Sequence, residues 1–470
     1  MLGILTDGLT KGVEGAFNSL SGNFFEPVIR LGVTGLSRAG KTVFITGLVA
    51  NLMNRGRMPQ LSAAADGRIQ AAWLQPQPHD TVARFDYEAH LAALTGDDPR
   101  WPASTRTVSE LRLSFRVQPE GIFGALGGPR TVHLDIVDYP GEWLMDLALM
   151  DKSYADWSED TLGRIGKRAQ AAEYMALARA EDGSRKLEEP RAQAMAAAFT
   201  GYLHDAREAG FSDCTPGRFL MPGDLAGSPA LTFAPLPMPA STARGSLWRE
   251  MERRYDAYKR EVVRPFFRDH FAKIDRQVVL VDALSAIHAG PQAVEDLRRT
   301  MAEILMAFRP GRNAFLTSIF TGRKVEKVLF AATKADHLHH LQHPRLTAIM
   351  EAMLRDAKDR ADFAGAQTAA MAIASVRATV EEEITQGGRI VHAVRGRLLS
   401  TGKMATMYAG ELPADPARLM APAREGAERW LDADYQIMAF APARMALAPG
   451  EGPPHIRLDR AAQFLIGNRL

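Results

Sequence analysis

The sequence of 470 residues has a single cysteine, Cys214, and no apolar run near the roughly 18 residues that a transmembrane helix needs. One cysteine excludes an internal disulfide framework and suits a reducing compartment. The amino terminus also lacks the continuous apolar stretch of a signal peptide, because Asp7, Lys11 and Glu14 interrupt it. We therefore expect a cytoplasmic protein.

The sequence also lacks a strong excess of charge of either sign. Its formal net charge of +2 argues neither for nor against a polyanionic partner, and we predict no nucleic-acid partner. With 46% hydrophobic and 24% charged residues, the composition is that of an ordinary globular protein and not of a disordered one. A chain of this length exceeds one ordinary core, so we expect about two or three domains.

The stretch GLSRAGKT, residues 35–42, fits the phosphate-binding loop (P-loop) pattern G-x-x-x-x-G-K-[ST]. Its glycines allow backbone N–H groups to turn toward phosphate oxygens. Lys41 can place a positive charge against the β- and γ-phosphates, and the Thr42 hydroxyl can ligate Mg²⁺. A predicted strand over 28–33 and a predicted helix over 43–49 provide the context that this chemistry requires. The predicted nucleotide contacts in this loop are Gly35, Ser37, Arg38, Ala39, Gly40, Lys41, Thr42 and Val43.

Residues 1–24 place apolar side chains at steps of three and four residues, a pattern that predicts an amphipathic helix. We expect this helix to pack on the body of the protein. Contact with a membrane surface is the alternative, but it is not favoured because Lys11 is the only basic residue in the segment.

Alternating apolar residues over 109–117 and 131–138 predict two neighbouring strands joined by a glycine-rich turn. Residues 57–104, before this pair, are polar and contain several prolines, so we expect them to be irregular. In translational-type GTPases the segment before such a hairpin carries a threonine that closes onto Mg²⁺ and the γ-phosphate. Thr105 and Thr107 are the candidates here; the alternative is that both simply begin a strand.

A second phosphate-sensing motif, Asp138-Tyr-Pro-Gly141, follows the second of these strands. Asp138 stands where a carboxylate can hold a Mg²⁺-bound water, and Gly141 offers a backbone N–H that can approach the γ-phosphate closely. Glu142 occupies the place of the glutamine that orients the attacking water in Ras. A carboxylate there can act as a base but also adds negative charge beside phosphate, so its catalytic role stays open.

Arg38 is a further catalytic candidate, alongside Glu142 and Lys41. GLSRAGKT resembles the P-loops of guanylate-binding large GTPases, in which an arginine at this position acts as a finger in cis. A guanidinium there can neutralise charge that develops on the γ-phosphoryl group. The alternative is a structural arginine paired with a nearby carboxylate.

The interval from 142 to 275 is long enough for a helical domain of its own. Residues 170–198 are rich in alanine and poor in β-branched residues, which favours helix. Trp248, Tyr255 and Val262 recur every seven residues near its end, and we interpret this stripe as core instead of a seam that faces a partner.

Strands are predicted next over 277–282 and 327–332, with a helix over 292–308 between them. The second strand runs into Thr333-Lys-Ala-Asp336, which fits the guanine-recognition motif [NT]-K-x-D. The Asp336 carboxylate can accept hydrogen bonds from guanine N1–H and the exocyclic amine together, a pair of donors that adenine cannot supply.

Other residues near this motif are candidates for base contacts. The stem of Lys334 can lie over the base, and Thr333 replaces the usual asparagine. A further strand over 370–375 would end at three weaker candidates for the base edge, Ser375, Val376 and Arg377. The histidines at 337, 339, 340 and 343 have no cysteine or acidic ligand at zinc spacing, so we expect surface histidines and no metal site.

Four stretches, GLSRAGKT, DYPGEW, TKAD and the closing IRLDRAAQFLIGNRL, together resemble the YcjX-like family of bacterial stress-associated P-loop proteins. The likeness runs over almost the whole chain. The resemblance implies a GTPase-like core with a helical insertion and a link to heat or envelope stress. For the location of the protein, peripheral contact at the inner membrane is the alternative to a purely cytoplasmic one. It implies no settled protein partner.

We therefore predict an α/β P-loop NTPase fold of the GTPase-like type, with a doubly wound sheet and a large helical insertion domain. The predicted parts are an N-terminal helical segment (1–27), a discontinuous GTPase core (28–141 and 276–396), the helical insertion (142–275) and a C-terminal extension packed on the core (397–470).

The leading functional hypothesis is a switch that hydrolyses GTP to GDP with Mg²⁺. One alternative is a nucleotide-ordered scaffold with little turnover, which Glu142 favours. The other is an ATPase, which needs Asp336 to face away from the base. A homodimer and an unidentified protein partner are further expectations.

Overall fold

The computed structural model describes most of the chain, namely residues 26–36, 39–103, 107–120, 128–269, 271–307, 325–363, 366–430 and 435–470. The helix predicted over 1–24 lies outside these residues, as do Ser37, Arg38 and Thr105. No helix within the described ranges has both the length and the apolar character needed to cross a bilayer.

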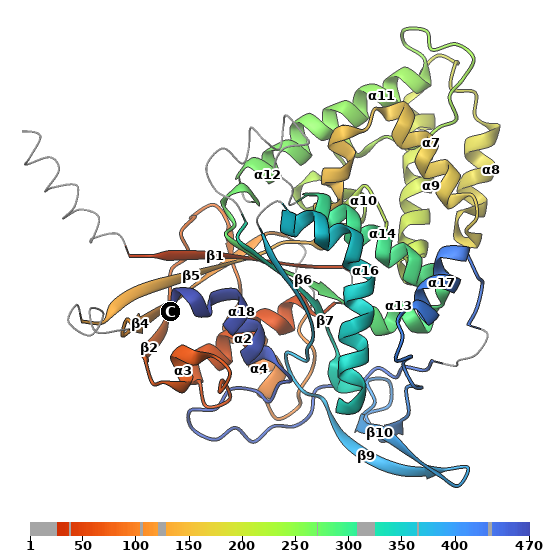
Figure 1. The fold of residues 1–470 in the computed structure, drawn as a ribbon. Helices are drawn as coiled ribbons and strands as arrows, with labels where there is room; N and C mark the ends of the chain where they lie inside the picture. The colour runs from red at the N-terminus through yellow and green to blue at the C-terminus, as the bar shows by residue number, and fades with distance from the viewer. Residues whose placement is uncertain are drawn as a thin grey trace, which may run out of the picture.

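An eight-stranded sheet is the centre of a mixed α/β fold (Figure 1). β1 lies between β5 and β6 and is parallel to both, and β7 and β8 continue the parallel part; β4 is antiparallel to both β5 and β2. The order is β2 (Ile69–Gln75), β4 (Ser109–Val117), β5 (Arg130–Asp138), β1 (Val28–Gly35), β6 (Arg276–Val281), β7 (Lys327–Ala332) and β8 (Gln367–Ala372), with β3 (Ala83–Arg84) paired to β4. The predicted strands are confirmed, although β8 begins and ends earlier than predicted.

The parallel strands are buried on both faces, which explains their nearly continuous apolar sequence. In β6, Val278 and Leu280 join the core that contains α2 (Lys41–Asn54) and α18 (Leu458–Ile466). The alternate residues Val279 and Val281 join the other core, which contains α14 (Pro291–Ala307), α13 (Ala283–Ala289) and α16 (His343–Phe363). Side chains therefore alternate between two helical layers, as the strand period of two requires.

The expectation that residues 57–104 are irregular is wrong. This stretch contains α3 (Ser62–Ala65), β2, β3 and α4 (Tyr87–Thr95). β2 is an edge strand whose side chains are mostly half-buried or exposed, so its sequence shows no clear alternation. The position of β2 is set by its pairing with β4, and this pairing cannot be predicted from the periodicity of the sequence.

The region from 379 to 407 also holds structure that its sequence did not predict. β9 (Thr379–Gln386), β10 (Arg389–Arg397) and β11 (Met404–Met407) form a separate antiparallel sheet. Gly387 and Gly388, with φ of 56° and 78°, make the hairpin between β9 and β10. A Gly-Gly pair between two strands is the available signal, because this turn needs positive φ at both positions. Downstream, α17 (Ala417–Glu425) precedes the closing helix α18.

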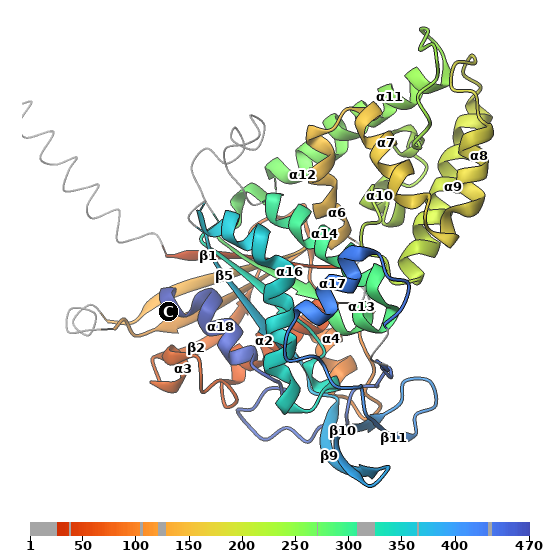
Figure 2. The ribbon, with the colours of Figure 1, turned by 45° about the vertical axis from the view of Figure 1, so that its right-hand side comes forward.

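Between β5 and β6 the described residues form helices and no strand. Figures 1 and 2 show these helices at the opposite end of the molecule from β9 and β10. They are α6 (Gly141–Met145), η1 (Asp146–Asp151), α7 (Tyr154–Ile165), η2 (Ala169–Ala171), α8 (Ala172–Ala180), α9 (Glu189–Glu208), α10 (Gly217–Leu220), η3 (Gly223–Leu225), η4 (Pro229–Leu231), α11 (Leu247–Tyr258), η5 (Lys259–Val263), α12 (Arg264–Asp269) and η6 (Phe271–Lys273). Their apolar core is continuous with the α14 and α16 face of the sheet. Division of the chain into the predicted domains stays a prediction.

The helical region has an aromatic core. Trp248, Tyr255 and Val262 are buried, which confirms that their seven-residue repeat marks core. Trp157 stacks on Tyr255 with ring centroids 5.0 Å apart, and Phe233 meets both rings edge-on. Such pairs contribute about 0.5–1.5 kcal/mol each beyond the burial of their area.

A buried carboxylate joins the first turn after α6 to the rest of the helical region. Asp146 accepts hydrogen bonds from the Gly217 amide at 2.7 Å and from the Tyr258 hydroxyl at 2.5 Å. Burial raises the pKa of Asp146 to about 7. Three segments that are distant in sequence therefore meet at one group that takes up a proton near neutral pH.

The raised pKa of Asp146 predicts that the free energy of unfolding depends on pH. Because its folded-state pKa is raised from 3.8 to about 7, the unfolded chain binds fewer protons in this window, and stability falls as pH rises from about 4 to about 7. Asp146→Asn keeps an acceptor for Gly217 and a partner for Tyr258 but has no charge to bury. We expect the thermal midpoint of the variant to exceed that of the wild type at pH 8 and to match it more closely at pH 5. Asp97→Asn, at an exposed position, is the control and should leave the wild-type pH dependence intact.

Candidate nucleotide-binding site

The predicted site residues gather at one edge of the central sheet. Because β1, β5, β6, β7 and β8 are parallel, their carboxyl ends lie at the same edge, where open α/β sheets bind ligands. Gly35, Asp138, Asp282, Thr333 and Ser375 end or follow these strands. The topology therefore brings the phosphate motifs and the base motif together.

The phosphate-binding loop lies between β1 and α2. Gly40 adopts φ of 80°, a conformation open to glycine, and α2 begins at Lys41 with no acidic residue in its first turn. The positive end of the α2 dipole is therefore available to an anion. The Lys41 ammonium donates to the Gly35 carbonyl at 3.4 Å. Ala39 and Thr42 are buried and Val43 is half-buried.

Gly141 brings the second phosphate motif against the first. A Cβ on Gly141 would lie 2.2 Å from the Gly35 carbonyl oxygen, so this backbone approach requires glycine. Asp138 is buried at the end of β5. Thr107 is exposed just ahead of β4, and Ser109, the first residue of that strand, pairs with Asp138. Thr107 therefore lies near the sheet edge at which β5 ends with Asp138.

The donor set at this edge suits Mg²⁺. Thr42, Thr107 and Asp138 offer hydroxyl and carboxylate oxygens, the hard ligands that Mg²⁺ takes in proteins. No sulfur or imidazole ligand stands at these positions. The residues therefore fit the ion that the motifs imply.

The base-recognition motif is held by the loop that follows β8. Asp336 is buried, and its carboxylate accepts a hydrogen bond from the Ala378 amide at 2.8 Å. The Thr379 hydroxyl donates to the Asp336 carbonyl. Lys334 has φ of 60°, and its ammonium pairs with the Asp282 carboxylate at the end of β6. The motif is therefore tied to both neighbouring strands of the sheet.

Two predicted base-side residues make mainly structural contacts. The Thr333 hydroxyl donates to the Val281 carbonyl at 3.3 Å, so it braces the strand end. The Ser375 backbone packs directly against Gly47 of α2. The approach is so close that a Cβ on Gly47 would lie 2.6 Å from the Ser375 carbonyl oxygen. Val376, beside it, is also buried. The loop after β8 is thus fixed against the helix that begins at Lys41.

Glu142 lies against the helical region. Its carboxylate is buried, and neither of its oxygens has a hydrogen-bond partner among the described residues. The Arg207 guanidinium of α9 is 3.9 Å away. A Cβ on Gly217 of α10 would lie 2.1 Å from the Glu142 carbonyl oxygen. Glu142 borders a cavity of about 100 Å³ that Leu36 and Arg207 also line. Its catalytic role stays a prediction, as does that of Arg38.

The sequence reasoning missed two charged residues of this site. Asp282 ends the apolar run of β6 just as Asp138 ends that of β5, so its strand-end position was a usable signal. Arg207 lies far along the chain from Glu142 in a helix without a motif, and nothing in the sequence marks it. Only the fold reveals the pair, in which α10 packs on both α6 and α9.

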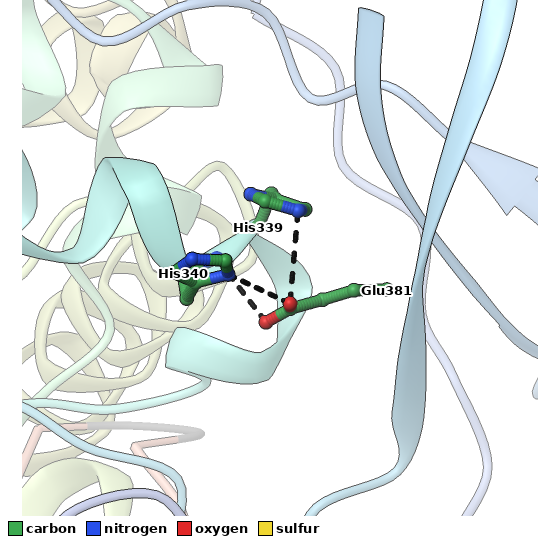
Figure 3. Close-up of side chains that lie close together, drawn as sticks. All are labelled: His339, His340 and Glu381. Atoms are coloured by element: carbon green, nitrogen blue, oxygen red, sulfur yellow. Dashed lines mark hydrogen bonds and ion pairs between the residues drawn. The ribbon is translucent and has the colours of Figure 1, made fainter.

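The expectation of surface histidines after the base motif is wrong for three of them. His337, His339 and His343 are buried, while His340 is exposed. No acidic residue stands at zinc spacing in the sequence, but the fold brings Glu381 of β9 to face His339 and His340 (Figure 3). The chain separation of 41 residues between His340 and Glu381 hides the cluster from any spacing rule.

Comparison with known proteins assigns the chain to a family. The model of the YcjX-like family, DUF463, matches residues 29–470. A protein of Escherichia coli K12 named "Ras-like GTPase YcjX" is 37% identical over 98% of this chain and 100% of its own length. A protein of the same name from Shewanella oneidensis MR-1 is 34% identical over 94% of each chain. The chain therefore belongs to the YcjX-like family.

Proposed function

We propose that this protein binds GTP with Mg²⁺, hydrolyses it to GDP and phosphate, and changes shape between the two states. The observation that carries the proposal is the meeting, at one sheet edge, of a phosphate loop, a close-packed Gly141 and a fixed Asp336. The names of both relatives support it. The proposal keeps the GTPase core at 28–141 and 276–396, with 142–275 as a helical insertion. A link to stress, a protein partner and homodimer formation stay predictions.

At the phosphate end, the α2 N-terminus and Lys41 would hold the β- and γ-phosphates. Thr42 and Asp138, with Thr107 or Thr105, would hold Mg²⁺, which supplies neutralisation of phosphate charge when it is bound. Lys41 now donates to a carbonyl of its own loop, so phosphate oxygens would replace a weak internal bond with stronger charged ones.

At the base end, Asp336 is positioned to select guanine. One of its oxygens accepts from Ala378, which fixes the plane of the carboxylate. Each carboxylate oxygen has two acceptor positions, so capacity remains for guanine N1–H and its exocyclic amine. Lys334 reaches across to Asp282, which stretches its aliphatic stem along the sheet edge where a base would lie.

The helical region is the part that a nucleotide switch would move. α6 begins at Gly141, and its next residues are anchored in helices of that region. Trp143 donates to the Met221 carbonyl at 3.2 Å, and Asp146 binds Gly217 and Tyr258. A shift of Gly141 toward a γ-phosphate would therefore pull on the helical region directly.

A scaffold with little turnover is the second candidate function. The burial of Glu142 beside Arg207 favours it, because a carboxylate held there by packing is poorly placed to orient a water. Arg38 would then carry any hydrolysis.

Removal of the Lys41 charge tests the phosphate site. Lys41→Ala should weaken GTP binding by about 100-fold, since a hydrogen bond to a charged group contributes about 1.5–3 kcal/mol. Isothermal titration calorimetry with GTP and Mg²⁺ measures the change. Lys167→Ala, at an exposed lysine, should bind GTP as the wild type does. Equal affinity of Lys41→Ala and wild type would refute the phosphate-loop assignment.

Base selection is tested at Asp336. Asp336→Asn replaces one acceptor oxygen with a donor group that opposes the donors of guanine. We expect weaker GTP binding and tighter binding of xanthosine triphosphate, whose extra carbonyl suits the amide. The amide oxygen can still accept from Ala378, so the loop should be retained. Asp80→Asn is the control at an exposed site. Wild-type protein that binds ATP as tightly as GTP would contradict guanine selection and favour the ATPase alternative.

Hydrolysis is tested by paired variants. If Arg38 acts in the transition state, Arg38→Ala should lower kcat by about 10³-fold, near the low end for an arginine finger, with little change in GTP affinity. Arg100→Ala, at an exposed arginine, is the control. Phosphate release should be followed over a range of protein concentrations, because self-association can be needed to turn the side chain inward. Equal turnover of Arg38→Ala and wild type at every concentration would mean that Arg38 is structural and that the switch needs an external activator.

A further inference from the structure

A cluster of metal-ligating side chains lies beside the base motif, outside the phosphate site. After η7 (Ala335–His337), His339 is the N-cap of η8 (His340–Gln342) and His340 is its first residue, while Glu381 lies on β9 (Figure 3). One ligand atom from each residue lies within 4.8 Å of the other two. His339 Nε2 is 3.6 Å and His340 Nδ1 is 2.8 Å from the same Glu381 oxygen.

We propose that His339, His340 and Glu381 bind one divalent transition-metal ion, with Zn²⁺ as the best fit. Two imidazole nitrogens and a carboxylate oxygen are a donor set that Zn²⁺ takes. A tetrahedral ion with ligands at about 2.0–2.2 Å separates those ligands by about 3.3 Å. The two separations of 3.6 and 2.8 Å bracket that value, so small side-chain shifts complete the site.

Neighbouring residues hold the three ligands in this arrangement. Glu381 and Glu383 lie on the same face of β9, and Glu383 pairs with His392 of β10, so His392 shares that face. The His392 ring stacks on His339 with centroids 4.6 Å apart. Its Nδ1 is buried without a hydrogen-bond partner among the described residues and lies 3.6 Å from Glu383. His392 therefore supports the His339 ring, and a water molecule would fill the fourth position of the ion.

Existing hydrogen bonds set the cost of binding the ion. The His340 backbone and ring nitrogens both contact Glu381, and Arg377 is 3.6 Å from its other oxygen. His339 Nδ1 accepts from the Leu341 amide at 3.4 Å, which leaves the ring proton on Nε2, the nitrogen that faces Glu381. Binding through Nε2 requires that proton to move to Nδ1, which can then no longer accept from the Leu341 amide, so binding gives up this one long hydrogen bond. The ring stays neutral, which is the form in which histidine ligates a metal.

The ion would fasten the two segments that position Asp336. His339 lies just past Asp336, and Glu381 lies just past Ala378 and Thr379, which bind Asp336 directly. A bridge between these segments would restrict the base loop before nucleotide arrives and so lower the ordering cost of binding. This consequence rests on the proposed function, whereas the metal site itself does not.

The site is tested on the full-length chain by Zn²⁺ titration calorimetry after removal of bound metal, in excess Mg²⁺ and without nucleotide. Excess Mg²⁺ occupies the oxygen ligands of the phosphate site. We expect one Zn²⁺ per chain, and a loss of affinity of at least about 100-fold in Glu381→Gln and in His340→Asn, since even outer-sphere changes cost about 10–100-fold. His204→Asn, at an exposed histidine of α9, should bind Zn²⁺ as the wild type does.

Two outcomes would overturn the site: no stoichiometric Zn²⁺ binding by the wild type, or equal binding by Glu381→Gln and His340→Asn. Circular dichroism checks that the variants fold. If they do not fold, Co²⁺ is added to the wild type instead. Intense visible absorption then supports a tetrahedral site, and the weak absorption of a solvated ion refutes it. GDP titrated with and without Zn²⁺ then tests the link to Asp336; tighter GDP binding with Zn²⁺ supports it and unchanged affinity refutes that link alone.

Discussion

Gly141 lies so close to Gly35 that a Cβ at this position would come within 2.2 Å of the Gly35 carbonyl oxygen. The end of β1 and the start of α6 are thereby in direct backbone contact, with no side chain between them. Any ligand that changes the phosphate loop must also act on α6. The parallel register of β1 with β5 sets this approach, because it brings the two strands to the same sheet edge. The rest of the site depends on that contact.

From α6 the structure continues into the helical region through groups that are costly to leave buried. Glu142 approaches Arg207, and Asp146 relies on Gly217 and Tyr258. A buried charge or carboxyl group is tolerated where its partners are fixed and is penalised when they move apart. Packed interfaces of this kind tend to switch between two distinct packing arrangements and do not deform continuously. The junction is thus suited to have two states, and under the proposed function the nucleotide would shift the balance between them.

Sequence alone predicted the parallel core because its strands are buried on both faces and read as apolar runs ending in Asp138, Thr333 or Ser375. It also placed the phosphate and base motifs, since each is local in the chain. It failed for β2 and for β9 to β11, where pairing decides the structure more than burial does. Contacts such as Glu142 with Arg207 and His340 with Glu381 join distant segments and leave no spacing pattern. Their discovery required the fold.

The two ends of the site are built differently, and this bears on how they respond to a ligand. Asp336 is held by hydrogen bonds from Ala378 and Thr379, which are adjacent in the chain. The phosphate end instead depends on Lys41, whose only described bond is a long one to its own loop, and on the α6 junction. Because Asp336 is already held in place, binding of a base there costs little conformational entropy. Lys41, in contrast, can form new hydrogen bonds to phosphate when a nucleotide binds. Differential affinity between nucleotide states should therefore arise at the phosphate end and reach the helical region through α6.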